Sequence, residues 1–311
     1  MKNLVIIGTS KIIEEHIKCL VKLKFNILAI CSSRKKSKNL NYLSKKYKIK
    51  NSFDNYADCE KFLKENKKNF AFFLAPRIKD SENILFKCLK YKKKIFIEKP
   101  VTKDLSFIKK ISNYKDNIFV GYNRIFYQNI AYIKKNLRKK KNLFIEVSCP
   151  ENNKNDISIN SCHIISILFY LFNKIEIVNI QRNENYILVI AKIKLKGLIT
   201  IRFNFNSSEN FSIKIIDKTK LYILKPIENL NVYDKIKIIK KNNLKSYTPV
   251  IKKNINEFNH NNFKPGFLKQ AREFGMFLNK NKKIFNNLNF AKKVINFCNK
   301  INYNSESKKK F

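Results

Sequence analysis

Long hydrophobic runs are missing from this sequence, and its cysteines lack any regular spacing. The longest later apolar stretch, "IISILFYLF", is about half the length that crosses a bilayer. The amino terminus, "MKNLVIIGTS", has too short an apolar run for a signal peptide, so we expect a soluble cytoplasmic protein without membrane insertion. Seven cysteines, an odd number without a CxxC pair, argue against a disulfide framework and a zinc site, and we predict no metal.

Acidic residues and arginine are also scarce. The 311 residues include 66 Lys and Arg against 23 Asp and Glu, a formal net charge of +43, and seven of the basic residues are Arg. Such a charge is typical of nucleic-acid-binding proteins. Proteins that recognise a specific base sequence favour Arg, however, because its planar guanidinium group can form paired hydrogen bonds with base edges and phosphates. Since the lysines are spread along the whole chain, we expect a solvated basic surface and no specific nucleic-acid partner.

The apolar residues that are present suffice for two domains. Hydrophobic residues make up 44% of the chain, and 311 residues exceed what one core usually serves. Up to residue 121, runs such as "NLVIIG", "NFAFFLAP" and "KKIFIEKP" alternate with amphipathic helical stretches. Runs that are apolar on every residue suit strands covered on both faces. We therefore predict an α/β domain over residues 1–121, a Rossmann dinucleotide-binding domain with a doubly wound parallel sheet.

After about residue 122 the pattern changes. A helix-like segment, a strand at "NLFIEVSC" and a helix over about 157–172 are followed by closely spaced strand-like runs. Short connections between successive strands indicate an antiparallel sheet. Two helical patterns, over about 263–279 and 288–301, close the chain. We predict an α+β domain over residues 122–311, built on a largely antiparallel open sheet with helices on one face.

The first strand-to-helix turn occupies the place where dinucleotide-binding folds carry G-x-G-x-x-G. Gly8 supplies the tight turn, whereas Ser10 and Ile13 stand at the second and third glycine positions. Amides at the start of a helix still attract phosphate through the helix dipole. The predicted cofactor-binding residues of this turn are Gly8, Thr9, Ser10, Lys11 and Ile12. An ordinary strand–turn–helix without a ligand is the alternative.

The end of the second predicted strand bears on the choice of cofactor. An acid that binds the adenosine ribose is expected about twenty residues beyond the glycines. Ser32, Ser33 and Arg34 stand there instead. Hydroxyls and a guanidinium suit the 2′-phosphate of NADP(H), and an acid would repel it, so we favour NADP(H), with NAD(H) as the other cofactor to consider. An exposed basic turn is the alternative.

Three segments together resemble the Gfo/Idh/MocA oxidoreductases, a family named after glucose–fructose oxidoreductase and inositol dehydrogenase. "IFIEKPVTKDL" is similar to the Glu-Lys-Pro that closes the family's fifth strand, and "GYNRIFYQNI" to its Asn-Arg-x-Phe at the domain crossover. "SCHIISILFYLF" is similar to the helix that carries the family's catalytic histidine, here His163. The order, the spacing and the closing "FLKQAREFGMFL" helix agree as well, so the resemblance covers nearly the whole chain.

The resemblance implies an NAD(P)-dependent oxidoreductase. It would move hydride between a nicotinamide and a carbonyl/alcohol or imine carbon of a sugar, nucleotide-sugar or related small metabolite. Lys99 would reach over the nicotinamide toward the reacting atom, and Pro100 would end the strand so that this lysine enters the cleft. His163 would trade the accompanying proton, since histidine titrates near neutral pH. A surface Glu-Lys pair and a hydrogen-bonded packing histidine are the alternatives.

Further site residues follow from the same resemblance. The remaining predicted cofactor contacts are Ala75, Pro76, Glu98, Lys99, Asn123 and Arg124. The predicted substrate contacts are Lys99, Tyr122, Asn160 and His163. Of the other histidines, His16 is expected to pack within a helix and His260 to lie in a loop. The second domain's sheet implies a homo-oligomer, either a dimer or a tetramer.

Departures from the family pattern leave two other hypotheses open. The family commonly has aspartates four residues before and three residues after the histidine, where this chain has Ile159 and Ser166. The family's Pro-x-x-x-His also changes, since Asp80 follows Pro76. A catalytically degenerate binding or accessory protein is therefore the alternative function. A nucleic-acid-binding protein is the third hypothesis and depends on net charge alone.

Overall fold

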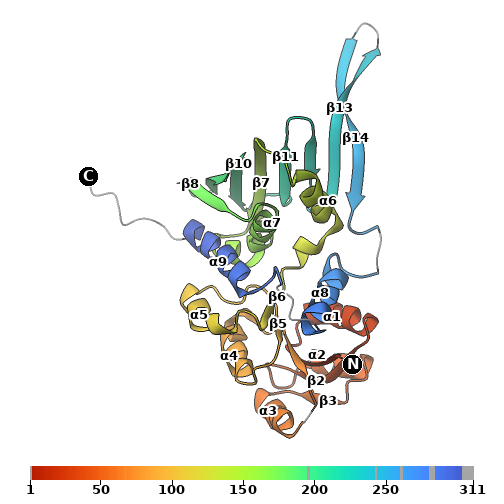
Figure 1. Ribbon diagram of the computed structural model, residues 1–311, viewed down its shortest axis with the longest axis vertical. Helices are drawn as coiled ribbons and strands as arrows, with labels where there is room; N and C mark the ends of the chain where they lie inside the picture. Colours follow the sequence, from red (N-terminus) through yellow and green to blue (C-terminus); the bar gives the residue numbers. More distant parts are fainter. Residues whose placement is uncertain are drawn as a thin grey trace, which may run out of the picture. The chain divides into compact units, whose positions relative to one another are not determined.

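The structure is a computed structural model that describes residues 2–66, 68–194, 197–241, 244–259, 262–279 and 284–302. His260 lies outside these residues. The chain divides into two compact units, each with a sheet of its own (Figure 1). Unit 1 comprises Met1–Asn123 and Asn262–Asn296, and unit 2 comprises Arg124–Asn261 and Phe297–Phe311.

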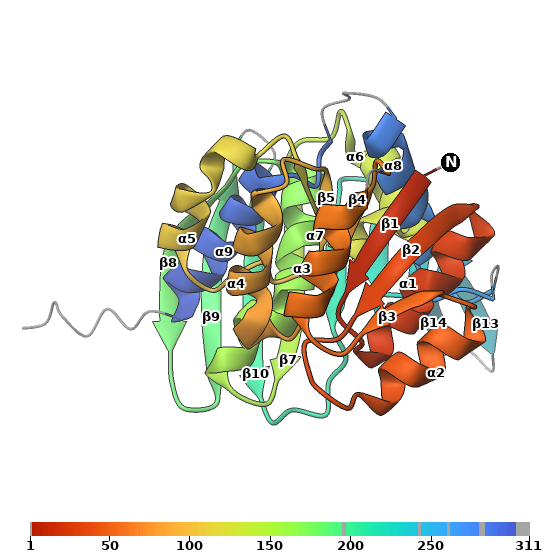
Figure 2. The ribbon, with the colours of Figure 1, turned by 90° about the horizontal axis from the view of Figure 1, so that it is seen from below.

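Unit 1 is built on six parallel strands in the order β3-β2-β1-β4-β5-β6 (Figure 2). The order reverses at β1, so right-handed crossovers place helices on both faces of the sheet. Central strands are accordingly buried on every residue, as in β4. The strands are β1 (Lys2–Ile7), β2 (Phe25–Cys31), β3 (Asn51–Phe53), β4 (Ala71–Leu74), β5 (Ile95–Ile97) and β6 (Ile118–Val120). The predicted doubly wound sheet is confirmed.

Several helices of unit 1 begin at polar side chains that cap them. Ser37 accepts the Leu40 amide at the start of α2, and Asn55 accepts the Asp58 amide at the start of α3. These caps satisfy amides that have no partner within the helix. The helices are α1 (Lys11–Lys22), α2 (Lys38–Lys46), α3 (Tyr56–Glu65), α4 (Ile78–Leu89), α5 (Leu105–Lys110), η1 (Ser112–Tyr114) and α8 (Phe267–Asn279), with η2 (Asn123–Phe126) and α9 (Leu288–Asn302) continuing into unit 2.

A phenylalanine cluster fills one face of the sheet in unit 1. Phe73, Phe96 and Phe119 lie on the neighbouring strands β4, β5 and β6, and successive ring centroids are 4.0 and 5.7 Å apart. The ring of Phe274, on α8, meets all three edge-on at 5.9, 5.5 and 5.7 Å. α8 therefore completes this core. Residues 262–296 accordingly group with unit 1, although the sequence placed them in the second domain.

Unit 2 contains an eight-stranded sheet in the order β14-β13-β12-β11-β7-β10-β9-β8. Its neighbouring strands are antiparallel except for β7 and β10. Along β7, buried residues alternate with more exposed ones, so one face of the sheet is covered and the other is open. The strands are β7 (Leu143–Glu151), β8 (Ile175–Arg182), β9 (Tyr186–Ile193), β10 (Gly197–Phe205), β11 (Ser212–Ile216), β12 (Leu221–Leu224), β13 (Asn229–Lys241) and β14 (Leu244–Asn256).

Helices α6 (Gln128–Leu137) and α7 (Cys162–Phe172) both lie in front of this sheet in Figure 1. A 3-10 turn, η3 (Lys154–Asp156), and a π turn, η4 (Ile157–Ser161), precede α7. The helix predicted from about residue 157 is therefore α-helical only from Cys162. The largely antiparallel open sheet with helices on one face is confirmed. Within the described residues, no helix combines the length and the hydropathy needed to cross a bilayer.

β13 and β14 form a long hairpin that the sequence analysis did not predict (Figure 1). β12 pairs only with Leu230–Tyr233 of β13, so the rest of the hairpin extends past its neighbour in the sheet. Large apolar side chains are exposed there, among them Ile236 (66%), Leu244 (75%) and Tyr247 (64%). The hairpin thus projects from the sheet of unit 2 and exposes apolar side chains among lysines.

Candidate active site

Gly8 forms the turn at the carboxyl end of β1. Its φ is +121°, and a Cβ added there would lie 2.1 Å from the carbonyl oxygen of Ala75. The Gly8 amide donates to the Cys31 carbonyl (2.8 Å), and the Ala75 amide donates to the Ile7 carbonyl (2.8 Å). The ends of β1, β2 and β4 therefore approach so closely that only glycine fits. Pro76, which follows Ala75, is half-buried at the same edge.

Helix α1 begins directly after this turn. Its N-cap, Ser10, makes no side-chain capping bond, and both Ser10 and Lys11 are exposed. Ile12 is half-buried, while Ile13 is fully buried against the sheet. At position 13, the G-x-G-x-x-G motif has a glycine that lets the helix pack closely on the sheet. Here the large side chain of Ile13 packs there instead. The amino end of α1 keeps amides that can bind phosphate.

Hydroxyl groups cluster where β2 ends. The Thr9 hydroxyl lies 3.2 Å from the hydroxyls of both Ser32 and Ser37. Ser32 is buried, and its hydroxyl also accepts the Arg34 amide (3.1 Å). Ser33 is half-buried and the Arg34 side chain is exposed. The structure thus brings the predicted residues of the first two strand ends together.

A carboxylate, that of Asp54, is hydrogen-bonded to the loop that follows β2. Its Oδ2 accepts the Lys36 amide at 3.5 Å. Asp54 follows β3 and is half-buried. It does not take part in the hydrogen bonds among Thr9, Ser32 and Ser37.

Glu98, at the end of β5, points into unit 1. Its Oε1 lies 2.7 Å from Nε2 of His16, whose side chain is 2% exposed, and its Oε2 accepts the Lys99 amide (3.3 Å). A Cβ added at Gly121 would lie 2.9 Å from Oε1, so this glycine leaves room for the carboxylate. From the sequence, His16 was expected only to pack within a helix, and its hydrogen bond with Glu98 was not predicted. Glu98 therefore holds the backbone at the end of β5, next to Lys99, through its hydrogen bond to the Lys99 amide.

Lys99 follows at the same carboxyl edge of the sheet. Its side chain is half-buried, whereas Pro100 is buried, and the peptide bond between them is cis. Lys99 therefore stands beside the strand ends that carry Gly8 and Ala75, since β4 neighbours both β1 and β5.

The crossover motif divides between the units. Tyr122 is fully buried, its ring edge-on to Phe290 at 5.5 Å, which leaves no side-chain surface for a ligand. Asn123 is 8% exposed and donates to the Pro265 carbonyl (3.2 Å). In unit 2, Arg124 lies 4.0 Å from Glu228 and stands over the ring of Phe211.

Unit 2 carries the predicted histidine on the first turn of α7. His163 is half-buried, and its carbonyl accepts the Ser166 hydroxyl (2.7 Å). Asn160, just before α7, is exposed. Its side-chain amide donates to Oε2 of Glu151 (3.0 Å), and Glu151 is buried. Lys99 thus belongs to unit 1 and His163 to unit 2.

The family model described as "Oxidoreductase family, NAD-binding Rossmann fold", that of the Gfo/Idh/MocA proteins, matches residues 2–117. The similarity to this family therefore covers the Rossmann domain. Among curated protein sequences, none matches.

Solved structures share the fold of this chain along nearly its whole length. A dehydrogenase from Chromobacterium violaceum has a TM-score of 0.76 at 12% identity, covering 97% of this chain and 94% of that one. An Agrobacterium radiobacter oxidoreductase, in complex with NAD+, L-tartaric acid and magnesium, has a TM-score of 0.73 at 12% identity, covering 96% and 94%. Lactobacillus casei myo-inositol dehydrogenase, in complex with NAD(H) and myo-inositol, has a TM-score of 0.69 at 15% identity, covering 99% and 96%.

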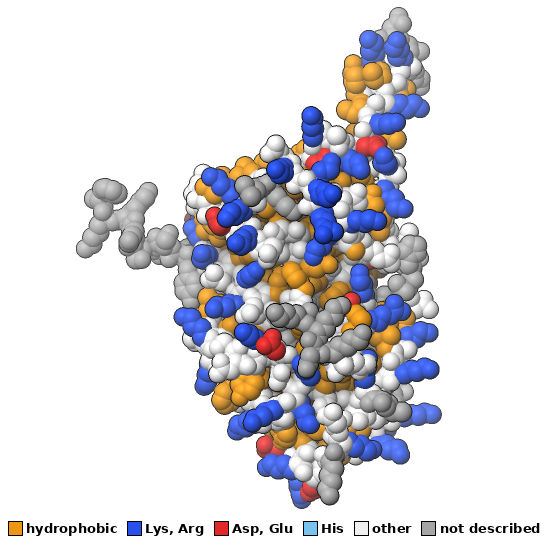
Figure 3. Space-filling model, viewed as in Figure 1, with side chains coloured by type: hydrophobic (Ala, Val, Ile, Leu, Met, Phe, Trp, Pro, Cys, Tyr) orange, Lys and Arg blue, Asp and Glu red, His pale blue; other side chains and the backbone are white. Residues whose placement is uncertain are grey.

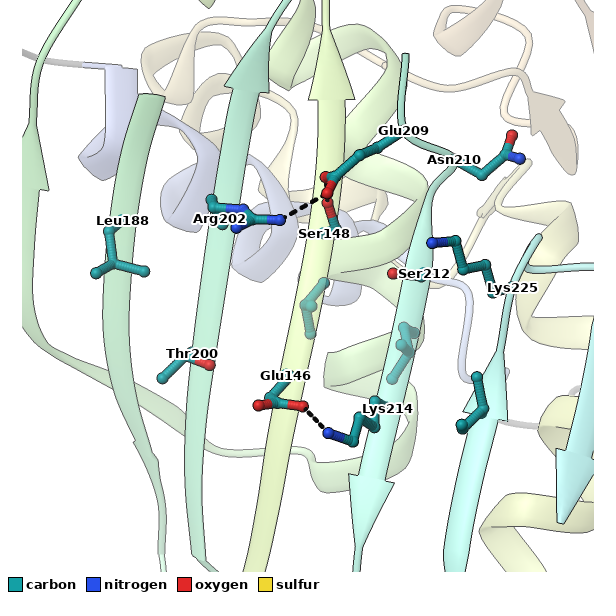
Figure 4. Close-up of a pocket in the computed structure, with 13 residues that line it drawn as sticks. Glu146, Ser148, Leu188, Thr200, Arg202, Glu209, Asn210, Ser212, Lys214 and Lys225 are labelled. Atoms are coloured by element: carbon teal, nitrogen blue, oxygen red, sulfur yellow. Dashed lines mark hydrogen bonds and ion pairs between the residues drawn. The ribbon is translucent and has the colours of Figure 1, made fainter. Parts of the chain in front are cut away.

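A hollow of about 440 Å³ lies on the sheet of unit 2 (Figure 4). Ion pairs join its side chains: Glu146 with Lys214 (2.7 Å) and Arg202 with Glu209 (2.8 Å). None of the predicted site residues lines it. Among the described residues, no three His, Cys, Asp or Glu side chains form a group that could hold a metal ion.

Glu151 was not among the site residues predicted from the sequence. Its signal is its place at the end of β7, where it follows Leu143, Ile145, Val147 and Cys149 on the buried face of the alternating strand. A buried strand has no packing reason to end in a charge. The same reasoning, applied to "LFIEVSCPE", would have marked Glu151.

Proposed function

We propose that this chain is an NAD(P)-dependent oxidoreductase. It transfers hydride between a nicotinamide cofactor and a carbonyl/alcohol or imine carbon of a sugar, nucleotide-sugar or related small metabolite. The observation that supports this most is the Gly8 turn, where the ends of β1, β2 and β4 meet beside an open helix amino end. Ligands of doubly wound sheets bind at this carboxyl edge.

The residues of unit 1 fit a dinucleotide. The amides from Gly8 to Ile12 would hold the pyrophosphate at the start of α1, with Ala75 and Pro76 beside it. Ser32, Ser33 and Arg34 would hold the adenosine ribose, and the exposed Arg34 favours the 2′-phosphate of NADP(H). When bound, the nicotinamide supplies the hydride. Lys99 would donate a hydrogen bond to the reacting oxygen or nitrogen of the substrate, and His163 would exchange its proton, with Asn160 as a further substrate contact.

Cofactor binding is the direct test. When NADPH is titrated with the protein, the fluorescence of the cofactor should rise and the signal should saturate. The affinity for NADPH should be about tenfold above that for NADH, since one charged contact is worth roughly that factor. Arg34→Glu should reverse the preference, and the exposed Lys103→Ala should leave it unchanged. Failure to bind either NADPH or NADH would end this proposal.

A degenerate binding protein is the second candidate, and the missing acids at Ile159 and Ser166 favour it. The Lys99→Ala/His163→Ala double variant separates the two. Loss of the biological activity that the chain supports in its host would exclude the binding-only function. Retention of that activity would exclude the enzyme.

The open face of the sheet in unit 2 supports self-association as a dimer or tetramer. Phe144, Val178 and the apolar hairpin of β13 and β14 are exposed there, and exposed apolar patches mark interaction surfaces. Basic side chains are scattered over the face seen in Figure 3 and do not form one patch. This distribution supports the absence of a specific nucleic-acid partner. The seven buried free cysteines suit the reducing cytoplasm. Light scattering tests the oligomeric state.

A further inference from the structure

Glu151 ends β7 as a carboxylate that is only 5% exposed, and neighbouring groups of unit 2 converge on it. Its Oε1 accepts both the amide (2.8 Å) and the hydroxyl of Ser161, and its Oε2 accepts the side-chain amide of Asn160 (3.0 Å). Burial raises the pKa of the Glu151 carboxyl, although these hydrogen bonds act in the opposite direction. Burying a carboxylate costs free energy, and three hydrogen bonds compensate that cost here. A carboxylate held in this way indicates a role beyond packing.

The bonded residues belong to the turn that starts the helix of His163. The π turn Ile157–Ser161 runs directly into α7, and His163 is the second residue beyond Ser161. The bond to the Ser161 amide also places a carboxylate at the amino end of α7, where the helix dipole favours negative charge. Glu151 therefore determines where α7 begins and how its first turn is oriented.

We propose that Glu151 is the positioning residue of His163: it holds the Asn160–Ser161 turn and thereby fixes the imidazole for proton transfer. The proposal rests on the proposed function, in which His163 exchanges the proton. One turn before His163, position 159 is isoleucine and offers no carboxylate. Glu151 brings a carboxylate to the same turn from β7.

Imidazole NMR tests this positioning without any substrate, because the chain has only three histidines. Glu151→Gln keeps the size of the side chain and removes its charge. Glu176→Gln, at an exposed position of β8, is the matched control. We expect the ring ¹H–¹⁵N signals of His163, assigned from their loss in His163→Ala, to shift in E151Q and not in E176Q. Unchanged His163 signals in E151Q would overturn the proposal.

A second pair of variants applies if E151Q does not fold. Ser161→Ala removes one bond to Glu151. Ser158→Ala is its control, since this buried hydroxyl of the same turn accepts from Asn302 (3.2 Å) and not from Glu151. The proposal requires the His163 signals to shift in S161A and to stay in place in S158A. Equal responses of the two variants would contradict it.

Kinetics add a readout that general destabilisation would not produce. With a substrate that the enzyme turns over with NADPH, E151Q should lower kcat about 10- to 100-fold. Its KM should stay within about twofold, since ground-state binding is retained. A rise in KM alone would refute the positioning role. If the unaltered protein binds neither NADPH nor NADH, the proposed function fails, while the NMR comparison still decides the role of Glu151.

Discussion

At the scale of residues, His16 and Glu98 show how two ionisable groups are kept inside an apolar core. Three phenylalanine rings surround the imidazole: those of Phe73, Phe96 and Phe267, at centroid distances of 4.9, 5.4 and 4.5 Å. The carboxylate lies 2.7 Å from Nε2. If one partner is removed, the other stays buried among apolar side chains without a hydrogen bond. The free-energy cost of that unsatisfied group exceeds the net stabilisation that the hydrogen bond provides.

His16→Ala should therefore lower the free energy of unfolding by about 3 kcal/mol, because it combines a cavity with an unsatisfied carboxylate. His16→Gln retains a donor and should cost about half as much. Urea denaturation measures both, with the exposed Lys22→Ala as the control, expected within about 0.5 kcal/mol of the parent. A loss below about 1 kcal/mol for H16A would contradict this account of the pair.

The seven cysteines should be inert in the folded protein. All are buried, and burial raises the pKa of the Cys19 thiol to about 12, so the reactive thiolate is scarce at pH 8. A colorimetric thiol reagent should label the native protein only as fast as it unfolds, and should label seven thiols in denaturant. Rapid native labelling of even one thiol would show that a cysteine is accessible.

Local sequence reveals some of these residues and not others. Gly8 and Lys99 were predictable because a strand end followed by a turn is visible in the residues themselves. The partnership of His16 with Glu98 was not, since 82 positions separate the two and only the packing of α1 against β5 joins them. The burial of Tyr122 likewise depends on Phe290, far along the chain.

At the scale of elements, the hairpin of β13 and β14 carries an apolar stripe. Ile236 pairs with Pro249 and Ile238 with Tyr247 across the two strands, and directly paired residues share one face. The opposite face includes the pair of Lys237 and Thr248. Solvent exposure of the stripe indicates that folding of unit 2 does not depend on it.

The double variant Ile238→Lys/Tyr247→Lys should leave the free energy of unfolding within about 0.5 kcal/mol of the parent, since it exposes no core. It should also lower the weight-average mass in light scattering, because charged side chains oppose apolar association. Thr248→Lys, on the other face of the hairpin, is the control for added charge. An equal effect of T248K on the mass would show that the stripe is not the contact.

Elements with a clear burial pattern were predictable from the sequence. The central strand β4 of unit 1 is apolar throughout because helices cover both faces of the sheet, and β7 of unit 2 alternates because one face of its sheet is open. The outer part of the hairpin was not predicted, although Ile236 and Ile238 alternate with lysines there, because both of its faces are exposed and no core face marks it as a strand. The grouping of α8 with unit 1 also escaped prediction, because it depends on which sheet receives Phe274.

At the scale of the whole molecule, like charges dominate the surface. Basic residues number 66 against 23 acidic ones, so ion pairs such as Lys46 with Glu14 (2.7 Å) neutralise only a minority of them. A high net charge opposes the compact state through self-repulsion. Salt shortens the range of this repulsion, from about 30 Å at 0.01 M to about 10 Å at 0.1 M.

Raising the NaCl concentration over that range should therefore increase Tm. A gain of about 1–2 kcal/mol corresponds to roughly 5 °C for a chain of this size. Differential scanning calorimetry measures the shift. Acetylation of only part of the lysines provides a second test, since it lowers the net positive charge and should make Tm less dependent on salt. A fall in Tm with salt would mean that attractive ion pairs outweigh the repulsion.

The return of residues 262–296 to unit 1 bears on synthesis in the cell. A ribosome releases Phe73, Phe96 and Phe119 long before it reaches Phe274, whose ring meets all three. Until then the nascent sheet presents an uncovered aromatic face, of the kind that chaperones bind. Completion of the amino-terminal fold must therefore await translation of residues 262–296.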